Sequence, residues 1–307
     1  MEKQNIFLSI IIAAHNSDSF IKETLCSLLE ALGENIVDCE IIMINDASTD
    51  NTGAILNDFL SDLPQARYFE VNFKNIGKVR NYGVSKCSGQ YITMLDSDDL
   101  LKKNSFNEIL YFLKKNSPDL LLNKLHEVRD LTITDTSWKG LKPEILTNEE
   151  AISRFLKHKD FQSHLIGQFF KRSIIQNVSF PEFVCYEDFY IFPELLKRSK
   201  IIFYSTESNY LYIKRNASLS SSPSTEKILN LISCLERMEL AFEQKYYDVI
   251  LCHWLDLRLK RMEWISNPVQ RKYIEMKVRR IYRIGFFLNP MVRFSYKRKA
   301  IELLWKK

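Results

Sequence analysis

Apolar and polar positions follow a repeating order along the first hundred residues and predict strands and helices in turn. Residues 8–14 form a nearly continuous apolar run around the β-branched residues Ile10, Ile11 and Ile12, which is typical of a strand buried on both faces of a parallel sheet. Apolar residues then recur at helical spacing from Phe20 to Leu32, before Gly33. A second predicted strand begins at Glu40, with an apolar run over residues 41–44, and another helical pattern follows it. This order predicts right-handed βαβ units in a doubly wound α/β sheet.

Polar residues come directly after the predicted strands. His15, Asp46 and Asp96 each fall just beyond the carboxyl end of one apolar run. Ligands of doubly wound sheets bind at that edge, where the carboxyl ends of parallel strands meet. We therefore expect these three residues to converge on one crevice.

The segment after Gln90 is the most distinctive polar turn, because an apolar strand runs straight into Asp96, Asp98 and Asp99. Carboxylates this close together repel one another, and their burial is costly without a partner. A hard divalent cation that also holds a diphosphate suits oxygen ligands at this spacing. A solvated acidic turn is the alternative interpretation.

A further polar cluster, residues 75–83, lies between the second apolar run and the acidic turn. Its glycines permit close backbone approach, and Lys78 and Arg80 could meet a phosphate or a base edge. A capped surface helix with solvated basic residues would have the same composition.

Four ordered motifs resemble those of inverting glycosyltransferases of family 2, which have the GT-A nucleotide-sugar fold. They are residues 10–16, 45–50, 75–83 and 96–98, and the similarity is spread over most of the first 220 residues. His15 stands where the family usually has tyrosine, and Asn45 replaces the first of two usual aspartates. The resemblance implies a GT-A catalytic domain over residues 1–220, with a Rossmann-like, mostly parallel sheet flanked by helices. Its nucleotide-sugar half would cover residues 1–100 and its acceptor half residues 101–220.

The resemblance also implies roles in the donor site. Asp46 would accept the N3–H of uracil, with the ring of His15 against the base. Asp98 would hold Mn²⁺ or Mg²⁺ between the two phosphates, and Asp96 would contact the metal or the ribose. Lys214 and Arg215 belong to a segment that resembles the loop closing over the diphosphate, although residues 218–225 could equally be a plain linker. The implied donor-binding residues are Ala13, His15, Asn16, Asp46, Ser48, Asn75, Lys78, Arg80, Asn81, Asp96, Ser97, Lys214 and Arg215.

The segment 185–196 resembles the family's acidic pair followed by an aromatic helix. Asp188 would be the catalytic base, with Glu187 beside it, because inverting transfer requires an acceptor hydroxyl to lose its proton. A helix cap is the alternative role for this pair. The implied reaction moves a hexose or N-acetylhexosamine from a nucleotide diphosphate sugar, UDP-linked by expectation, to a glycan hydroxyl with inversion. Two alternatives are a sugar nucleotidyltransferase, although no glycine occurs before Gly33, and a degenerate carbohydrate-binding protein.

The last part of the chain, residues 221–307, is predicted to be a helical, basic and aromatic extension. From Lys245 onward it has 16 Lys and Arg against 5 Asp and Glu. This composition fits a helix on an anionic membrane surface, or a bundle with buried aromatic residues and solvated charges. No groove-reading motif accompanies it, so we expect no nucleic acid partner.

Composition and family analogy together give an expected cellular setting. No run of 18 apolar residues predicts a membrane span, and the six cysteines lack disulfide or metal spacing. We therefore expect a cytoplasmic protein, peripheral on the inner face of the cell membrane. The expected acceptor is a polyprenyl-diphosphate-linked glycan in bacterial capsule, O-antigen or exopolysaccharide synthesis.

Overall fold

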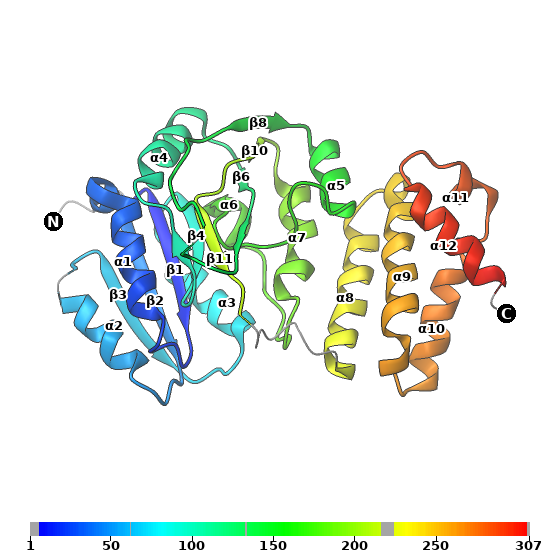
Figure 1. The fold of residues 1–307 in the computed structure, drawn as a ribbon, viewed down its shortest axis with the longest axis horizontal. Coiled ribbons are helices and arrows are strands. Elements are labelled where there is room, and N and C mark those ends of the chain that lie inside the picture. Colours follow the sequence, from blue (N-terminus) through cyan, green and yellow to red (C-terminus); the bar gives the residue numbers. More distant parts are fainter. Residues whose placement is uncertain (1–5, 62, 133, 216–223, 306–307) are drawn as a thin grey trace. The chain divides into compact units, whose positions relative to one another are not determined.

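The computed structural model describes residues 6–61, 63–132, 134–215 and 224–305 (Figure 1). The chain divides into two compact units, one made of Met1–Glu182 with Glu194–Ser218 and the other of Phe183–Pro193 with Leu219–Lys307. One division therefore falls inside helix α7 (Glu187–Arg198). The domain boundary predicted between residues 220 and 221 lies outside the described residues.

The first unit is built on a mixed sheet. Among the described residues, eight strands pair in the order β3 (Ala66–Val71), β2 (Cys39–Asp46), β1 (Leu8–Ala14), β4 (Tyr91–Asp96), β9 (Phe169–Lys171), β6 (Leu120–Asn123), β10 (Ile202–Ser205) and β8 (Pro143–Leu146). Strands β9 and β8 run antiparallel to their neighbours, and the other pairings are parallel. A smaller sheet joins β5 (Leu100–Leu101), β11 (Tyr210–Ile213) and β7 (His126–Val128).

The strand order locates the switch point of the sheet, where successive chain connections change direction. From β1 the chain moves outward through α1 (Ile21–Leu32), β2 and α2 (Thr52–Ser61) to β3, and α3 (Ile76–Lys86) then brings it back to β4 on the other side of β1. Right-handed crossovers place α1 and α2 on one face of the sheet and α3 on the other. The carboxyl ends of β1 and β4 therefore form the switch point where ligands of such sheets bind.

The rest of the first unit extends this sheet. Helices α4 (Ser105–Asn116), α5 (Asn148–Leu156) and α6 (Arg172–Ile175) accompany its later strands (Figure 1). The predicted β-branched strands are fully buried, since Leu8, Ile10, Ile12, Ile41 and Ile42 are all inaccessible to solvent. The predicted mostly parallel sheet flanked by helices is confirmed.

The second unit is helical in its described part. It contains the first turns of α7 and then α8 (Thr225–Ala241), α9 (Tyr247–Arg261), α10 (Pro268–Arg279), α11 (Ile284–Leu288) and α12 (Phe294–Trp305). Trp254 and Phe286 lie in its core, fully buried. None of the helices described is long and apolar enough to cross a lipid bilayer.

Candidate active site

The ends of the first three strands share an uncommon backbone conformation. Asn16, Ala47 and Lys74 have φ of 48°, 54° and 48°, and they follow β1, β2 and β3 respectively. Non-glycine residues seldom adopt this left-handed conformation, which costs energy and is concentrated at functional sites. The strain therefore marks the carboxyl edge of the sheet, where the sequence places the polar turns.

Asp46 orders one of these turns through its carboxylate. Its Oδ1 accepts hydrogen bonds from the backbone N–H groups of Phe73 (2.6 Å) and Lys74 (2.9 Å), and its Oδ2 accepts one from Asn75 (3.2 Å). The residue is 5% exposed. Each carboxylate oxygen can accept two hydrogen bonds, so Oδ1 is saturated and Oδ2 retains one acceptor position.

His15 and Asn16, which follow β1, contact the turn that follows β2. Nδ1 of His15 lies 2.6 Å from the carbonyl oxygen of Asp46, and the imidazole remains exposed. The backbone N–H of Asn16 donates to Oγ of Ser48 at 3.0 Å. An exposed ring is thus held beside the Asp46 turn, as base stacking would require.

The acidic turn after β4 is tied to two arginines. Oδ1 of Asp96 lies 3.6 Å from Nη2 of Arg80, whose side chain is 9% exposed. Nε of Arg215 donates to Oδ2 of Asp98 at 3.1 Å, and the guanidinium lies 3.6 Å from the ring centroid of Phe20. The predicted basic and acidic residues therefore meet at the switch point.

Asp99 has a different role from its neighbours, because it is buried. Its Oδ2 accepts from the Tyr210 hydroxyl and its Oδ1 from the backbone N–H of Ile213, both at 2.7 Å. Burial, reinforced by the charge of Asp96, raises the pKa of Asp99 to about 8. Since Ile213 directly precedes Lys214 and Arg215, Asp99 fastens the start of that basic segment to the acidic turn.

Several other predicted residues also make protein contacts at this edge. Ala13 pairs with Asp96 across β1 and β4, and Oγ of Ser97 lies 2.7 Å from Oγ of Ser17. Asn75 caps α3 by accepting from the Lys78 backbone N–H at 3.0 Å.

The remaining predicted polar residues have partners farther along the chain. Nζ of Lys78 pairs with Glu182 at 2.8 Å, and Nζ of Lys214 pairs with Glu127 at 2.6 Å; both pairs are exposed. The Asn81 amide exchanges two hydrogen bonds with the Phe180 backbone, at 2.9 and 2.8 Å.

Close packing beside Asn81 requires a glycine. A Cβ added to Gly77 would lie 2.1 Å from the Pro181 carbonyl oxygen. The start of α3 is therefore held against residues 180–181.

Glu187 and Asp188 begin helix α7 and belong to the second unit. Glu187 is buried, Asp188 is half-buried, and Oδ1 of Asp188 accepts from the Phe189 backbone N–H at 2.6 Å. Tyr186, just before them, has a φ of 74°, and its hydroxyl accepts from Arg261 at 2.7 Å. The acidic pair thus follows a strained residue that is anchored within its own unit.

Two residues near the acidic turn were missed by the sequence interpretation. Tyr210 bridges the turn, accepting from the Asp96 backbone N–H at 3.1 Å and donating to Asp99. His164 is half-buried beside Tyr212, with ring centroids 6.2 Å apart. Burial lowers the pKa of His164. The charges of Asp96 and Glu127 raise this pKa, and the charge of Arg80 lowers it. The sequence places Tyr210 at the start of the segment that resembles the diphosphate loop, but no motif indicates that Tyr210 pairs with Asp99 or that His164 lies nearby.

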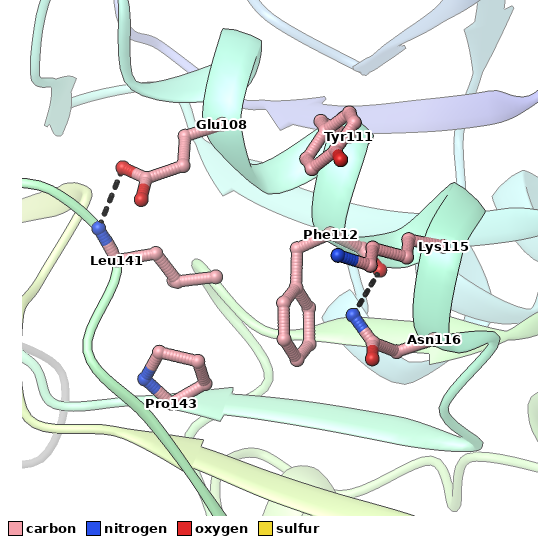
Figure 2. Close-up of a pocket in the computed structure, with 7 residues that line it drawn as sticks. All are labelled: Glu108, Tyr111, Phe112, Lys115, Asn116, Leu141 and Pro143. Atoms are coloured by element: carbon pink, nitrogen blue, oxygen red, sulfur yellow. Dashed lines mark hydrogen bonds between the residues drawn. The ribbon is translucent and has the colours of Figure 1, made fainter.

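Two surface pockets lie in the first unit. One, of about 300 Å³, lies between α4 and the Leu141–Pro143 segment, where Glu108 accepts from the Leu141 backbone N–H at 2.7 Å (Figure 2). None of the predicted site residues lines it, so it is separate from the acidic turn. The other, of about 470 Å³, lies beside α3 and α6 and includes Asn81.

The acidic turn could hold a divalent cation together with a substrate. Among the described residues, no group of three or more His, Cys, Asp or Glu side chains is arranged as a metal site. The side chains of Asp96 and Asp98 are 35% and 41% exposed and offer hard oxygen ligands. One or two carboxylates suffice for a cation whose other ligands are phosphates and water, so the residues fit.

Comparisons with known proteins identify the family and the fold of the chain. The model of the family described as "Glycosyl transferase family 2" matches residues 9–176. An uncharacterized glycosyltransferase of Mycoplasma genitalium is 28% identical over 222 residues, covering 71% of each chain. The poly(ribitol-phosphate) beta-N-acetylglucosaminyltransferase TarS of Staphylococcus aureus is 24% identical over 257 residues, covering 81% of this chain and 43% of TarS. The chain therefore spans less than half the length of that relative.

Solved structures show the same fold. Residues 1–349 of TarS in complex with UDP superimpose with a TM-score of 0.69 at 17% identity, covering 97% of this chain and 88% of that one. The complex with UDP-GlcNAc gives a TM-score of 0.61 at 18% identity, covering 98% and 80%. The resemblance predicted from the motifs is confirmed. The chain belongs to glycosyl transferase family 2, and its fold is the GT-A fold of these enzymes.

Proposed function

We propose that this enzyme transfers a hexose or N-acetylhexosamine from a UDP-sugar to a glycan hydroxyl, with inversion and with a divalent cation. The observation that carries the proposal is the meeting of Asp96 and Asp98 with Arg80 and Arg215 at the switch point of the sheet. The two arginines suit the negative diphosphate of the donor, and the two carboxylates suit the divalent cation that would accompany it. The TarS complexes with UDP and UDP-GlcNAc support the choice of nucleotide.

Asp46 and His15 are proposed to bind the base. The remaining acceptor position on Oδ2 of Asp46 suits the N3–H of uracil, and the exposed His15 ring beside it suits stacking. The proposed donor site also includes Ala13, Asn16, Ser48, Asn75, Asn81 and Ser97.

Arg215 is proposed to serve the diphosphate. Its guanidinium is already directed at the acidic turn by Asp98 and by the ring of Phe20. Negative charge grows on the leaving diphosphate as the glycosidic bond breaks, and a fixed cation stabilises that charge. Arg80 is buried beside Asp96 and adds to the positive potential, while Lys78 and Lys214 lie on flanking exposed pairs.

Asp98 and Asp96 are proposed to hold Mn²⁺ or Mg²⁺. Such a cation, when bound, neutralises phosphate charge as a Lewis acid. Until then the Arg215 side chain balances the charge of Asp98. The ion pair therefore holds the Asp98 side chain in place.

Asp188 is proposed to be the catalytic base that removes the acceptor proton, with Glu187 beside it. Its half-buried carboxylate accepts a hydrogen bond from the Phe189 backbone N–H, which helps to fix the side chain, and a carboxylate is a group that can remove a hydroxyl proton. The cap role and the base role are compatible on these contacts.

The proposed setting is the synthesis of a bacterial surface polymer such as capsule, O-antigen or exopolysaccharide. Relatives named for poly(ribitol-phosphate) glycosylation, including the beta-glucosyltransferase of Bacillus spizizenii, support a polymer acceptor. A polyprenyl-diphosphate carrier and a place at the inner face of the cell membrane complete the proposal. The basic C-terminal region supports that place, because it has 16 Lys and Arg against 5 Asp and Glu from Lys245 onward.

The test is a panel of nucleotide sugars incubated with the purified protein and Mn²⁺ or Mg²⁺. We expect slow hydrolysis of one UDP-sugar, measured as UDP release, with loss of that activity on chelation. Release of pyrophosphate from UTP and a sugar phosphate, with no hydrolysis of any nucleotide sugar, would instead identify a nucleotidyltransferase.

A further inference from the structure

Helix α12 has an apolar stripe on its solvent side. Phe294 and Trp305 are 80% and 84% exposed, and Ile301 between them is 45% exposed. Together with Arg298 they occupy positions i, i+4, i+7 and i+11, which lie on one face of an α-helix. We call these four residues the α12 stripe.

Other residues of α12 form its inward side and contact the rest of the second unit. Ala300 is fully buried, the Tyr296 hydroxyl donates to Asp256 at 2.8 Å, and Nζ of Lys299 pairs with Asp256 at 2.9 Å. At 100° per residue, these three positions centre on the side of the helix opposite the α12 stripe. The stripe is therefore a second apolar face that the core of the unit does not explain.

Helix α11, the element before α12, repeats this division (Figure 1). Phe286 is fully buried, whereas Ile284 and Leu288, four residues apart, are 78% and 75% exposed. Each of these successive helices thus buries one apolar residue, Phe286 in α11 and Ala300 in α12, and presents other apolar side chains to solvent.

The charge of this region identifies the kind of partner. Residues 268–307 contain 12 Lys and Arg against 2 Asp and Glu. A second copy of the same surface would be repelled by this like charge, whereas anionic lipid attracts it and accommodates aromatic and aliphatic side chains at the interface. Tryptophan and phenylalanine beside basic residues are the composition of an interfacial helix.

We propose that the α12 stripe, with Ile284 and Leu288 of α11, docks on the surface of an anionic lipid bilayer. Phe294, Ile301 and Trp305 enter the headgroup region, while Arg298 stays at the lipid phosphates. This inference specifies which surface contacts the membrane proposed above. It rests on the proposed function in one respect, namely that docking would bring the enzyme to a lipid-linked acceptor.

The test compares three full-length proteins by co-flotation with vesicles. One is the natural sequence, the second carries Phe294→Ser, Ile301→Ser and Trp305→Ser, and the third carries Val37→Ser, Ile145→Ser and Leu240→Ser. The control residues are also exposed and apolar but lie outside α10–α12. Vesicles contain phosphatidylcholine alone or with phosphatidylglycerol, at low and high salt.

We expect the natural protein to bind the vesicles with phosphatidylglycerol and to bind them less at high salt. The stripe variant should bind at least about tenfold more weakly, and the control variant as tightly as the natural protein. All three should keep the same circular dichroism melting curve and the same donor hydrolysis.

Equal vesicle binding by the stripe and control variants would overturn the inference, as would a natural protein that ignores vesicles. A natural protein that is dimeric in solution, with a monomeric stripe variant and no vesicle binding by either, would assign the stripe to a second copy and also overturn it. Intact vesicle binding without donor hydrolysis of any nucleotide sugar would refute the proposed function and leave the docking surface standing.

Discussion

Replacing Asp46 by asparagine should remove the hydrogen-bond acceptor Oδ2, which the Asn75 backbone N–H and the proposed base share. An amide oxygen in place of Oδ1 can still accept from Phe73 and Lys74, at distances now 2.6 and 2.9 Å. The amide nitrogen then replaces Oδ2 and turns a donor toward the Asn75 backbone N–H, now 3.2 Å away. Because a hydrogen bond to a charged group is worth about 1.5–3 kcal/mol, we expect the free energy of unfolding to fall by about 2–3 kcal/mol.

The same change should alter which nucleotide is bound. Uracil offers a donor at N3 and cytosine an acceptor, so a carboxylate oxygen favours UDP and an amide nitrogen favours CDP. Loss of one hydrogen bond with a charged acceptor corresponds to about 10- to 100-fold weaker UDP binding. The preference for UDP over CDP should therefore narrow in Asp46→Asn.

Isothermal titration with UDP and CDP, together with urea unfolding, measures both effects. Asp50→Asn is the matched control, because Asp50, four residues after Asp46, also accepts two backbone N–H groups, from Asp18 at 3.1 Å and Thr52 at 3.0 Å. The control should keep the natural UDP to CDP ratio. An unchanged ratio in Asp46→Asn, in a protein that is still folded, would refute the assignment of Asp46 to the base.

Three further substitutions test other parts of the proposal. Asp98→Ala should weaken UDP binding in the presence of Mn²⁺ by at least about tenfold and leave the unfolding curve nearly unchanged, since the side chain is 41% exposed; donor hydrolysis that survives both this change and chelation would refute metal dependence. Asp188→Asn should lower turnover by about 10²- to 10⁴-fold at constant donor affinity, whereas inactivation by Glu187→Gln alone would assign the base to Glu187. Gly77→Ala should cost about 3 kcal/mol or more of stability, because its Cβ meets a backbone carbonyl at 2.1 Å, whereas Gly285→Ala, with open space around it, should gain about 0.5–1 kcal/mol in α11; equal melting temperatures would contradict the packing argument.

The parts of the fold that could be predicted are those with a local pattern. The buried strands β1 and β2 are apolar in six of seven and five of eight residues, and the polar residues at their ends fall at the carboxyl edge by the geometry of parallel sheets. This rule placed Asp96 in a predicted crevice, and the side chain of Asp96 does meet Arg80 of the 75–83 cluster. The motifs themselves were sufficient to identify the family, as the match over residues 9–176 confirms.

The contacts that organise the site could not be predicted in this way. Tyr210 and Asp99 are far apart in the sequence, and their pairing depends on β11 joining β5 in the second sheet. Likewise, nothing near Lys78 in the sequence announces Glu182 as its partner. Long-range partners are set by how the strands are ordered, which periodicity within one element does not specify.

The C-terminal region shows the same limit on a larger scale. Its composition is equally that of a membrane-surface helix, in which aromatic and basic residues meet the lipid, and of a bundle, in which aromatic residues form the core and basic residues are solvated. What separates them is helix phase: Trp254 and Phe286 point inward and are fully buried, whereas Phe294 and Trp305 point outward and are 80% and 84% exposed. A composition count cannot distinguish these pairs, since each contains one phenylalanine and one tryptophan among basic neighbours. The position of the core decides which side of each helix is buried. One set of aromatic side chains therefore holds the bundle together, and the other set is presented to the surface that the enzyme contacts.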